Sequence, residues 1–299
     1  MGEMKEVCER GYAKINLHLD VTGRLDGGYH RVETVMQTVT LFDEVTLTIK
    51  NGGGVSLSCN VQGVPTDEKN LACRALALFF EKIGQTEGVH IHIQKSIPMA
   101  AGMAGGSADA AAALRGINRL MGEPLTVGEL CALGAALGAD VPFCIAEGCA
   151  YADGRGDVLH EFPPMPDCTV LVTCEGEGVS TPWAYGLIDE LWDGFEENSS
   201  YLPKNVDALR LACENGSLGA LAEATYNIFQ EPILARRPVA ARAKELMERS
   251  GADVAMMSGS GPSVFGLFER ETQAESAKAA LESEGYRTYL CRPHFPTRK

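Results

Sequence analysis

The stretch PMAAGMAGGSADAAA, residues 98–112, is the most informative part of the sequence. Small residues let the backbone of residues 98–107 approach a ligand closely. The alanine-rich segment after it predicts a helix over residues 107–121, whose first turn presents unpaired N–H groups and the positive end of the helix dipole. A loop followed by a helix N-terminus forms a phosphate cradle. Ser107 could cap this helix or offer its hydroxyl to a metal ion on the phosphates.

The glycine-rich loop also has a purely structural interpretation. No lysine precedes Ser107, so the stretch is not a loop of the G-x-x-x-x-G-K-[ST] kind, and its glycines do not have G-x-G-x-x-G spacing. A glycine-rich turn in front of an alanine-rich packing helix is therefore the alternative.

Period-two alternation predicts strands over residues 12–21, 44–50, 55–61 and 89–95. Each should bury one face and keep a polar face. Residues 51–54, NGGG, predict that the second and third of these strands form a hairpin. The polar face of the first strand carries Lys14, Asn16, His18 and Asp20.

Helix signals separate these strands. Residues 70–83 have a helical pattern. Thr126 begins a further helix with the T-x-x-E spacing of a capping box, and Gly138 is expected to end it. Pro142 predicts an extended conformation for Val141.

The second half of the chain has a different character. A proline-rich segment, residues 163–166, suggests a boundary between domains 1–162 and 163–299. Beyond it the pattern predicts helices on an antiparallel sheet. The expected elements are a strand over 169–174, helices between 181 and 250, strands over 254–258 and 263–268, a helix over 272–284 and a strand over 286–291.

Composition excludes several classes of protein. Lys plus Arg number 26 and Asp plus Glu 40, which gives a net charge of −14 and argues against a general nucleic-acid binder. Uncharged apolar runs stay well short of the ~20 residues of a membrane helix. The first ten residues lack an apolar signal core, so we expect a cytoplasmic protein. Ten cysteines without a C-x-x-C pair predict buried, reduced thiols.

Two further features gain meaning beside the loop. The stretch SGSGPS, residues 258–263, stands between two predicted strands and by itself fits a flexible hairpin. Lys14 by itself fits a solvated strand lysine. Together, an early lysine strand, a P-x-x-x-G-[LM]-x-G-G-S loop and a late G-x-G-P turn resemble the three signatures of the GHMP kinase superfamily.

Other stretches resemble one branch of that superfamily, whose members act on 4-diphosphocytidyl-2-C-methyl-D-erythritol. They are AKINL (13–17), TGR (22–24), DGGYH (26–30), ETVMQ (33–37) and LGADVPF (137–143). The resemblance implies an α+β, two-domain GHMP kinase fold. It combines an N-terminal ribosomal-protein-like α/β domain with a C-terminal ferredoxin-like α+β domain, and the active site is expected in the cleft between them.

The resemblance also implies an activity. This is ATP-dependent phosphorylation of the 2-hydroxyl of that cytidine diphosphate derivative of methylerythritol, a step of non-mevalonate isoprenoid precursor biosynthesis. The alternatives are another GHMP small-molecule kinase, of the homoserine or mevalonate type, or a catalytically silent ligand sensor on the same fold. No nucleic acid or membrane partner is expected, and the sequence does not decide between a monomer and a homodimer.

The catalytic pair implied by the resemblance is Asp140, as the base, with Lys14 beside it. An aspartate within hydrogen-bond reach can take the proton of an attacking hydroxyl. A neighbouring lysine keeps that aspartate ionised and can stabilise charge on the transferring phosphoryl group. The alternative for Asp140 is a surface carboxylate near a helix end.

Binding residues follow from the same resemblance. ATP is expected with Mg²⁺, which Ser107 could contact. The implied ATP-binding residues are Asn70 and Lys95, near the adenine, and the loop residues Pro98, Met99, Ala100, Ala101, Gly102, Met103, Ala104, Gly105, Gly106 and Ser107. The implied acceptor-binding residues are Asn16, Tyr29, His30 and Tyr185, which offer polar groups and rings to a pyrimidine, together with Gly259, Ser260 and Gly261.

Overall fold

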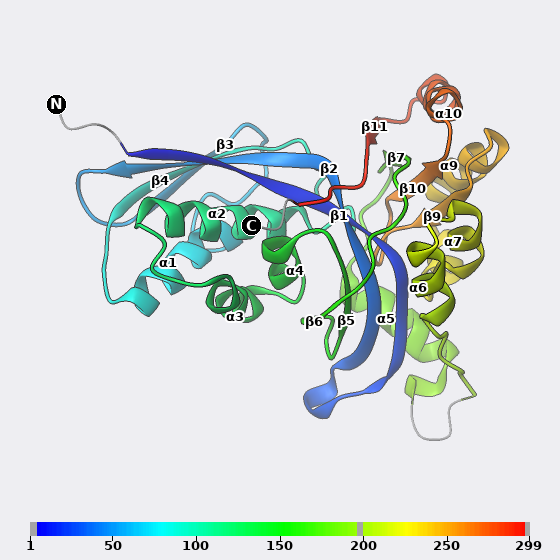
Figure 1. Ribbon diagram of the computed structural model, residues 1–299, viewed down its shortest axis with the longest axis horizontal. Helices are drawn as coiled ribbons and strands as arrows, with labels where there is room; N and C mark the ends of the chain where they lie inside the picture. Colours follow the sequence, from blue (N-terminus) through cyan, green and yellow to red (C-terminus); the bar gives the residue numbers. More distant parts are fainter. Residues whose placement is uncertain (1–4, 196–199, 297–299) are drawn as a thin grey trace. The chain divides into compact units, whose positions relative to one another are not determined.

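A computed structural model describes residues 5–195 and 200–296 of the chain (Figure 1). The chain divides into two compact units. Unit 1 consists of Met1–Ala13, Phe42–Met99 and Ala104–Glu147. Unit 2 consists of Lys14–Leu41, Ala100–Met103 and Gly148–Lys299.

These compact units differ from a linear division between residues 162 and 163. The strands β1 (Glu6–Arg24) and β2 (His30–Lys50) each contribute residues to both units. The part of β1 that belongs to unit 2 pairs with β8 (Tyr226–Asn227), and the corresponding part of β2 pairs with β5 (Cys149–Asp153). Strand pairing therefore joins an early segment to the C-terminal half of the chain.

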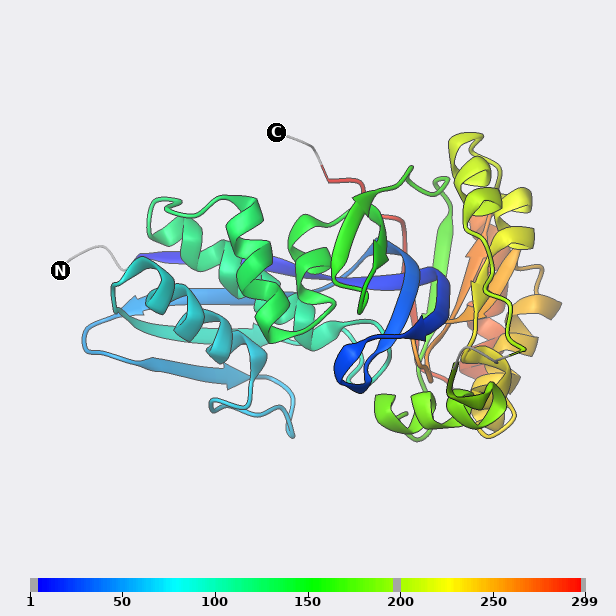
Figure 2. The same ribbon diagram turned by 90° about the horizontal axis from the view of Figure 1, so that it is seen from below.

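Unit 1 is a sheet with helices on one face (Figure 1 and Figure 2). The strand order is β3-β4-β2-β1, with β4 antiparallel to β2 and parallel to β3. Four helices cover the sheet, and their apolar sides form the core. The remaining elements are β3 (Val55–Cys59), β4 (Gly88–Gln94), α1 (Leu71–Ile83), α2 (Gly105–Leu120), α3 (Val127–Leu137) and α4 (Val141–Ala146).

The predicted hairpin between the second and third strands is wrong. β4 lies between β2 and β3, so that Leu47 and Leu57 both pair with Ile91. A Cβ added at Gly88 would lie 1.8 Å from the carbonyl oxygen of Gly52. Glycine is required at the start of β4 because the connection from β2 to β3 passes directly against it.

The helix signals of unit 1 are largely confirmed. The Thr126 capping box and the Gly138 C-cap of α3 are both present. The extended conformation predicted for Val141 is wrong, because Val141 is the first residue of α4 and Pro142 follows it in the first turn. Proline is tolerated there because its missing N–H would have no partner within the helix.

Unit 2 contains the predicted antiparallel sheet. Its order is β11-β7-β10-β9, and each neighbouring pair is antiparallel. Two helices pack on it through alanines and leucines. The elements are β7 (Thr169–Thr173), α9 (Pro238–Arg249), β9 (Val254–Met257), β10 (Val264–Phe268), α10 (Glu271–Ser283) and β11 (Thr288–Cys291), which have the chain order and strand order of a ferredoxin-like fold.

A second core of unit 2 forms around Leu19, Val21 and Val32 of β1 and β2. Residues of α5 and α8 complete it. The other elements of this unit are η1 (Asp26–Gly28), β6 (Val158–Glu161), α5 (Thr181–Leu191), η2 (Asp193–Phe195), α6 (Asp207–Glu214), α7 (Leu218–Ala224) and α8 (Gln230–Leu234).

The alternation of β1 predicted a solvated polar face, but in the structure this face is buried. Lys14 is 4% exposed and Asn16 3%, while His18 and Asp20 are 0% exposed. Buried polar groups need hydrogen-bond partners, and Lys14, Asn16 and Asp20 make theirs with other groups of unit 2.

Two chain-wide expectations can be compared with the structure. All ten cysteines are free thiols; Cys73, Cys144, Cys168, Cys213 and Cys291 are buried, and the other five are partly or fully exposed. Within residues 5–195 and 200–296, every helix is too short or too polar to cross a membrane.

Candidate functional site

The ammonium group of Lys14 is the centre of the first cluster of predicted residues, which lies in unit 2. Lys14 Nζ donates to Asn16 Oδ1 at 2.7 Å and to the carbonyl oxygen of Gly102 at 3.0 Å. The backbone N–H of Lys14 also donates to the carbonyl oxygen of Met103 at 3.2 Å. The strand lysine is thereby tied directly to the glycine-rich loop.

The turn at residues 258–263 holds the same loop. Ser258 Oγ donates to the carbonyl oxygen of Gly102 at 3.3 Å, and Ser263 Oγ donates to that of Ala101. Gly102 has a φ of +70°, and a Cβ added to it would lie 2.4 Å from the carbonyl oxygen of Ser258. The structure therefore brings two of the sequence motifs together. The two serines at the ends of the turn make the side-chain contacts with the loop. The role of Gly259, Ser260 and Gly261 in binding the acceptor stays a prediction.

A second cluster in unit 2 contains His30 and Tyr185. Their ring centroids are 4.4 Å apart. Asp189 Oδ1 lies 2.8 Å from His30 Nε2, and its Oδ2 lies 2.8 Å from a guanidinium nitrogen of Arg24. Asp189 was not predicted, but it follows Tyr185 by four residues on α5, which places both on one helix face.

Tyr29 was predicted to act together with His30. Its side chain is 57% exposed, and the guanidinium carbon of Arg155 lies 5.5 Å from the centre of its ring. The structure thus brings His30 and Tyr185 together, whereas the ring of Tyr29 stays largely exposed to solvent.

Asn70 and Lys95, the residues expected near adenine, lie in unit 1. Asn70 caps α1: its Oδ1 accepts from the N–H of Ala72 at 2.9 Å. Lys95 Nζ contacts Asp43 Oδ2 at 2.5 Å and Asp109 Oδ2 at 2.8 Å. The Lys95 ammonium is thus engaged by two buried carboxylates, which the sequence analysis did not identify as site residues.

Lys95, Asp43 and Asp109 form a buried triad, in which burial and charge act differently on the pKa values of Lys95 and Asp109. Burial alone would lower the pKa of Lys95, but the charges of Asp109 and Asp43 raise it above its ordinary value. Burial raises the pKa of Asp109 to about 7, against the opposing charge of Lys95. Asp43 Oδ1 also accepts from the N–H groups of Ser96 and Ile97. The triad therefore connects the segment that enters the glycine-rich loop with the N-terminal part of α2, which follows the loop.

The N-terminus of α2 begins earlier than predicted. Ala104 is the N-cap residue, with a φ of 59°, and none of the described side chains caps the helix there. Ser107 is the third helical residue, so the capping role considered for it is wrong. The N–H groups of Gly105, Gly106 and Ser107 belong to the first turn, where N–H groups have no acceptor within the helix.

Asp140 lies in unit 1 at the N-cap position of α4, and its carbonyl oxygen accepts from the N–H of Cys144 at 3.0 Å. Its carboxylate thus precedes a helix N-terminus, where negative charge is favoured. Lys14 belongs to unit 2, so the pairing of these two residues stays a prediction.

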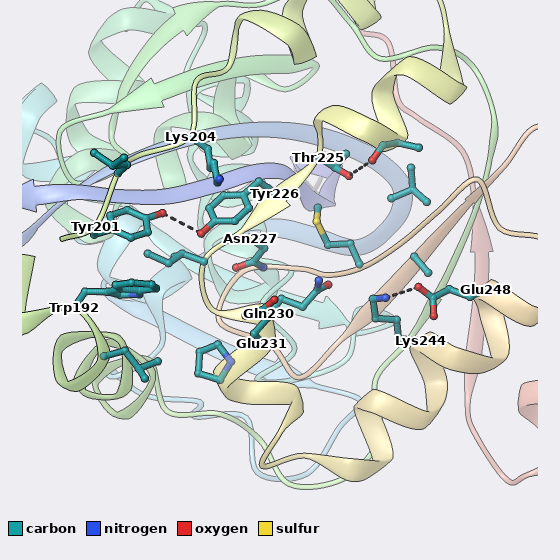
Figure 3. A pocket seen from close by; sticks show the side chains of 18 of the residues that line it. Trp192, Tyr201, Lys204, Thr225, Tyr226, Asn227, Gln230, Glu231, Lys244 and Glu248 are labelled. Atoms are coloured by element: carbon teal, nitrogen blue, oxygen red, sulfur yellow. Dashed lines mark hydrogen bonds and ion pairs between the residues drawn. The ribbon is translucent and has the colours of Figure 1, made fainter.

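Unit 2 also contains a cavity of about 1050 Å³ that includes none of the predicted residues (Figure 3). Tyr201 and Tyr226 line one end, with their hydroxyls 3.0 Å apart. Asn227 Nδ2 donates to the carbonyl oxygens of Met257 and Gly259 at 2.8 and 2.9 Å. Asn227, which lines the cavity, therefore supports the turn that contacts the glycine-rich loop.

Comparisons with known proteins define the class. The chain matches the family model described as GHMP kinases N terminal domain over residues 70–148 and that described as GHMP kinases C terminal over residues 208–287. Together the two matches cover more than half of the chain. A solved structure of homoserine kinase from Cytophaga hutchinsonii, 19% identical, covers 98% of this chain and 96% of its own, with a TM-score of 0.74. The expected GHMP kinase fold is confirmed.

Closer relatives identify the branch. Two proteins named 4-diphosphocytidyl-2-C-methyl-D-erythritol kinase, from Enterococcus faecalis and Brevibacillus brevis, are 37% and 42% identical to this chain. The matches cover 96% and 90% of this chain, and 99% and 90% of the relatives. A solved structure of 4-(cytidine 5'-diphospho)-2C-methyl-D-erythritol kinase is 30% identical, covers 97% of this chain and all of its own, and has a TM-score of 0.79. The chain belongs to the 4-diphosphocytidyl-2-C-methyl-D-erythritol kinase family.

Proposed function

We propose that this chain transfers the γ-phosphoryl group of ATP to the 2-hydroxyl of 4-diphosphocytidyl-2-C-methyl-D-erythritol, as a step of non-mevalonate isoprenoid precursor synthesis. Family membership supports the reaction. The observation that carries the assignment to residues is the contact of 3.0 Å between Lys14 Nζ and the carbonyl oxygen of Gly102. This contact holds the Lys14 ammonium against the backbone of the glycine-rich loop, to which we assign the binding of the ATP phosphates.

Phosphoryl transfer needs a base and charge stabilisation. Asp140 accepts the proton of the acceptor hydroxyl as its oxygen attacks the γ-phosphorus. The bond between the γ-phosphorus and the β–γ bridging oxygen breaks, and ADP leaves. Lys14 stabilises the negative charge on the transferring group, so the protein contributes mainly orientation and electrostatics.

The glycine-rich loop and the start of α2 bind the ATP phosphates. The uncapped first turn of α2 supports this role, because its N–H groups can donate to phosphate oxygens. Mg²⁺ arrives as part of the Mg·ATP substrate, and Ser107, a partly exposed residue, has a hydroxyl that is suited to contact it or a phosphate. In the described part of the chain, no cluster of three His, Cys, Asp or Glu side chains is arranged to hold a metal ion by itself.

The acceptor's cytosine is recognised by the cluster of His30 and Tyr185. Two rings that are already 4.4 Å apart offer an aromatic surface, and His30 adds a hydrogen-bonding edge. The exposed ring of Tyr29 provides a further stacking face.

The ten free thiols are consistent with a reducing, cytoplasmic location.

The test is to incubate the protein with Mg·ATP and, separately, the cytidylyl methylerythritol, homoserine or mevalonate, and to follow ADP release. We expect ADP only with the cytidylyl acceptor. ADP with homoserine or mevalonate would overturn the assignment of the cytidine-binding residues. Failure to release ADP with any acceptor, while ATP still binds, would favour a silent ligand sensor.

A further inference from the structure

The amide group of Asn16 makes three hydrogen bonds inside unit 2. Its Oδ1 accepts from Lys14 Nζ at 2.7 Å and, at the longer distance of 3.5 Å, from Ser258 Oγ. Its Nδ2 donates to Thr34 Oγ1 at 2.8 Å. All four side chains are buried, with Lys14 4%, Asn16 and Thr34 3% and Ser258 1% exposed. An amide rotated by 180° would point its NH₂ group at the lysine ammonium, and two donors would then face each other.

The hydroxyl of Thr34 determines which way this amide points. Thr34 Oγ1 donates its proton to the carbonyl oxygen of His18 at 2.7 Å. A hydroxyl has one proton to donate, so toward Asn16 the oxygen can only accept. It therefore selects the NH₂ end of the amide, which leaves the carbonyl end for Lys14.

The orientation of Asn16 in turn restricts Lys14. The lysine ammonium has three N–H donors in a tetrahedral arrangement. Asn16 Oδ1 and the carbonyl oxygen of Gly102 engage two of them. With two N–H directions fixed, the direction of the third is fixed as well.

We propose that Thr34 is a positioning residue for phosphoryl transfer: its hydroxyl orients the Asn16 amide, which holds the Lys14 ammonium in its reactive direction. This inference rests on the proposed function, in which Lys14 stabilises the transferring phosphoryl group. Thr34 acts through Asn16 and itself touches neither substrate. Misplacing a catalytic group by about 1 Å can lower a rate on the order of 10²-fold.

Two substitutions separate the hydroxyl from the shape of the side chain. Thr34→Val removes the hydroxyl and keeps the volume, whereas Thr34→Ser keeps the hydroxyl. We expect Thr34→Val to lower kcat roughly 10- to 100-fold while the KM values for ATP and the cytidylyl acceptor change less than about threefold. Thr34→Ser should retain kcat within about threefold. ATP binding and thermal unfolding establish that each variant is folded, and Thr34→Ala replaces Thr34→Val if the latter does not fold.

A double-mutant cycle tests the route through Asn16. In an Asn16→Ala background the orienting contact has no target, so Thr34→Val should lower kcat by less than about twofold. A normal kcat for Thr34→Val, equal losses in the serine and valine variants, or an undiminished loss in the Asn16→Ala background would each overturn the inference. Lys14→Met separates this from the proposed function: full turnover by Lys14→Met would overturn both, whereas lost turnover by Lys14→Met with normal turnover by Thr34→Val would overturn only the role of Thr34.

Discussion

The imidazole of His30 and the phenol ring of Tyr185 lie against each other, with 4.4 Å between their centroids and 32° between their planes. Asp189, one helical turn after Tyr185, lies 2.8 Å from the same imidazole. The tyrosine on α5 and the histidine at the start of β2 therefore belong to one packed side-chain cluster, although 154 residues separate them in sequence.

We expect Tyr185→Ala to weaken binding of the cytidylyl acceptor. Stacking of one base on an aromatic ring contributes about 1–3 kcal/mol, so the KM for the acceptor should rise roughly 10- to 100-fold while the KM for ATP stays unchanged. Tyr185→Phe keeps the ring and is the matched control. Steady-state kinetics with each substrate varied in turn measures both constants. An unchanged acceptor KM in Tyr185→Ala would remove this ring from the acceptor site.

We expect Asp140→Asn to lose turnover and keep ATP affinity. An amide cannot take the proton of the acceptor hydroxyl, so kcat should fall at least ~10²-fold. Rapid-quench measurement of phosphoryl transfer reports the chemical step, and titration calorimetry reports ATP binding. Glu68→Gln removes an exposed carboxylate of the same unit and should behave like the parent. Near-normal turnover by Asp140→Asn would assign the base to another residue.

The two carboxylates around Lys95 should differ in their contribution to stability. Asp43 also accepts two backbone N–H groups, so Asp43→Asn should lower the free energy of unfolding by about 3–5 kcal/mol. Asp109→Asn should cost only about 1 kcal/mol, because Asp109 Oδ1 has no hydrogen-bond partner in the described structure and burial raises its pKa to about 7. Urea unfolding at pH 7.5 compares the two variants. Equal losses of unfolding free energy in the two variants would show that Asp43 and Asp109 contribute equally to stability, which would contradict this prediction.

The buried His18 should make the protein less stable in mild acid. Both ring nitrogens lack hydrogen-bond partners among the described residues, and burial lowers the pKa of His18 to about 4. Between pH 6.5 and 4 the unfolded chain therefore binds a proton that the folded protein does not, so stability falls as pH falls. From pH 8 to pH 5 this loss amounts to about 2 kcal/mol.

His18→Leu isolates the contribution of this histidine. The free energy of unfolding of the variant should decrease by about 2 kcal/mol less than that of the parent over the same pH range. Urea titrations at pH 8 and pH 5 give the two differences, in which all other titrating groups are shared. Parallel pH profiles for parent and variant would contradict the assignment.

Gly102 should not tolerate a side chain. Its φ is +70°, and an added Cβ would lie 2.4 Å from the carbonyl oxygen of Ser258, so Gly102→Ala must displace either the loop or the turn. We expect a loss of at least ~1–2 kcal/mol in the free energy of unfolding, together with a reduced kcat. Gly128→Ala is the control, because a Cβ there meets nothing within 4 Å and stability should stay equal or rise by up to ~1 kcal/mol. Equal behaviour of the two variants would contradict the close approach.

Local signals in the sequence predicted the elements well. The capping box at Thr126, the Asn70-to-Gly84 limits of α1 and the strand–turn–strand–helix–strand order of the C-terminal part all agree with the structure. Each depends on residues a few positions apart, whose capping, turn and periodicity preferences act over that same short range. The pairing of β4 between β2 and β3 was missed, because a turn signal shows where the chain reverses and not which strand becomes its neighbour.

The site shows the same division. The family, the glycine-rich loop, the lysine strand and the G-x-G-P turn could be predicted from the sequence, because these motifs are contiguous and their residue types carry the chemistry. Three features emerge only in the folded protein: the polar face of β1 is buried, Ser258 and Ser263 hold the loop, and Thr34 orients Asn16 toward Lys14. These contacts join residues far apart along the chain, and buried polar groups acquire partners only when the whole unit has packed around them.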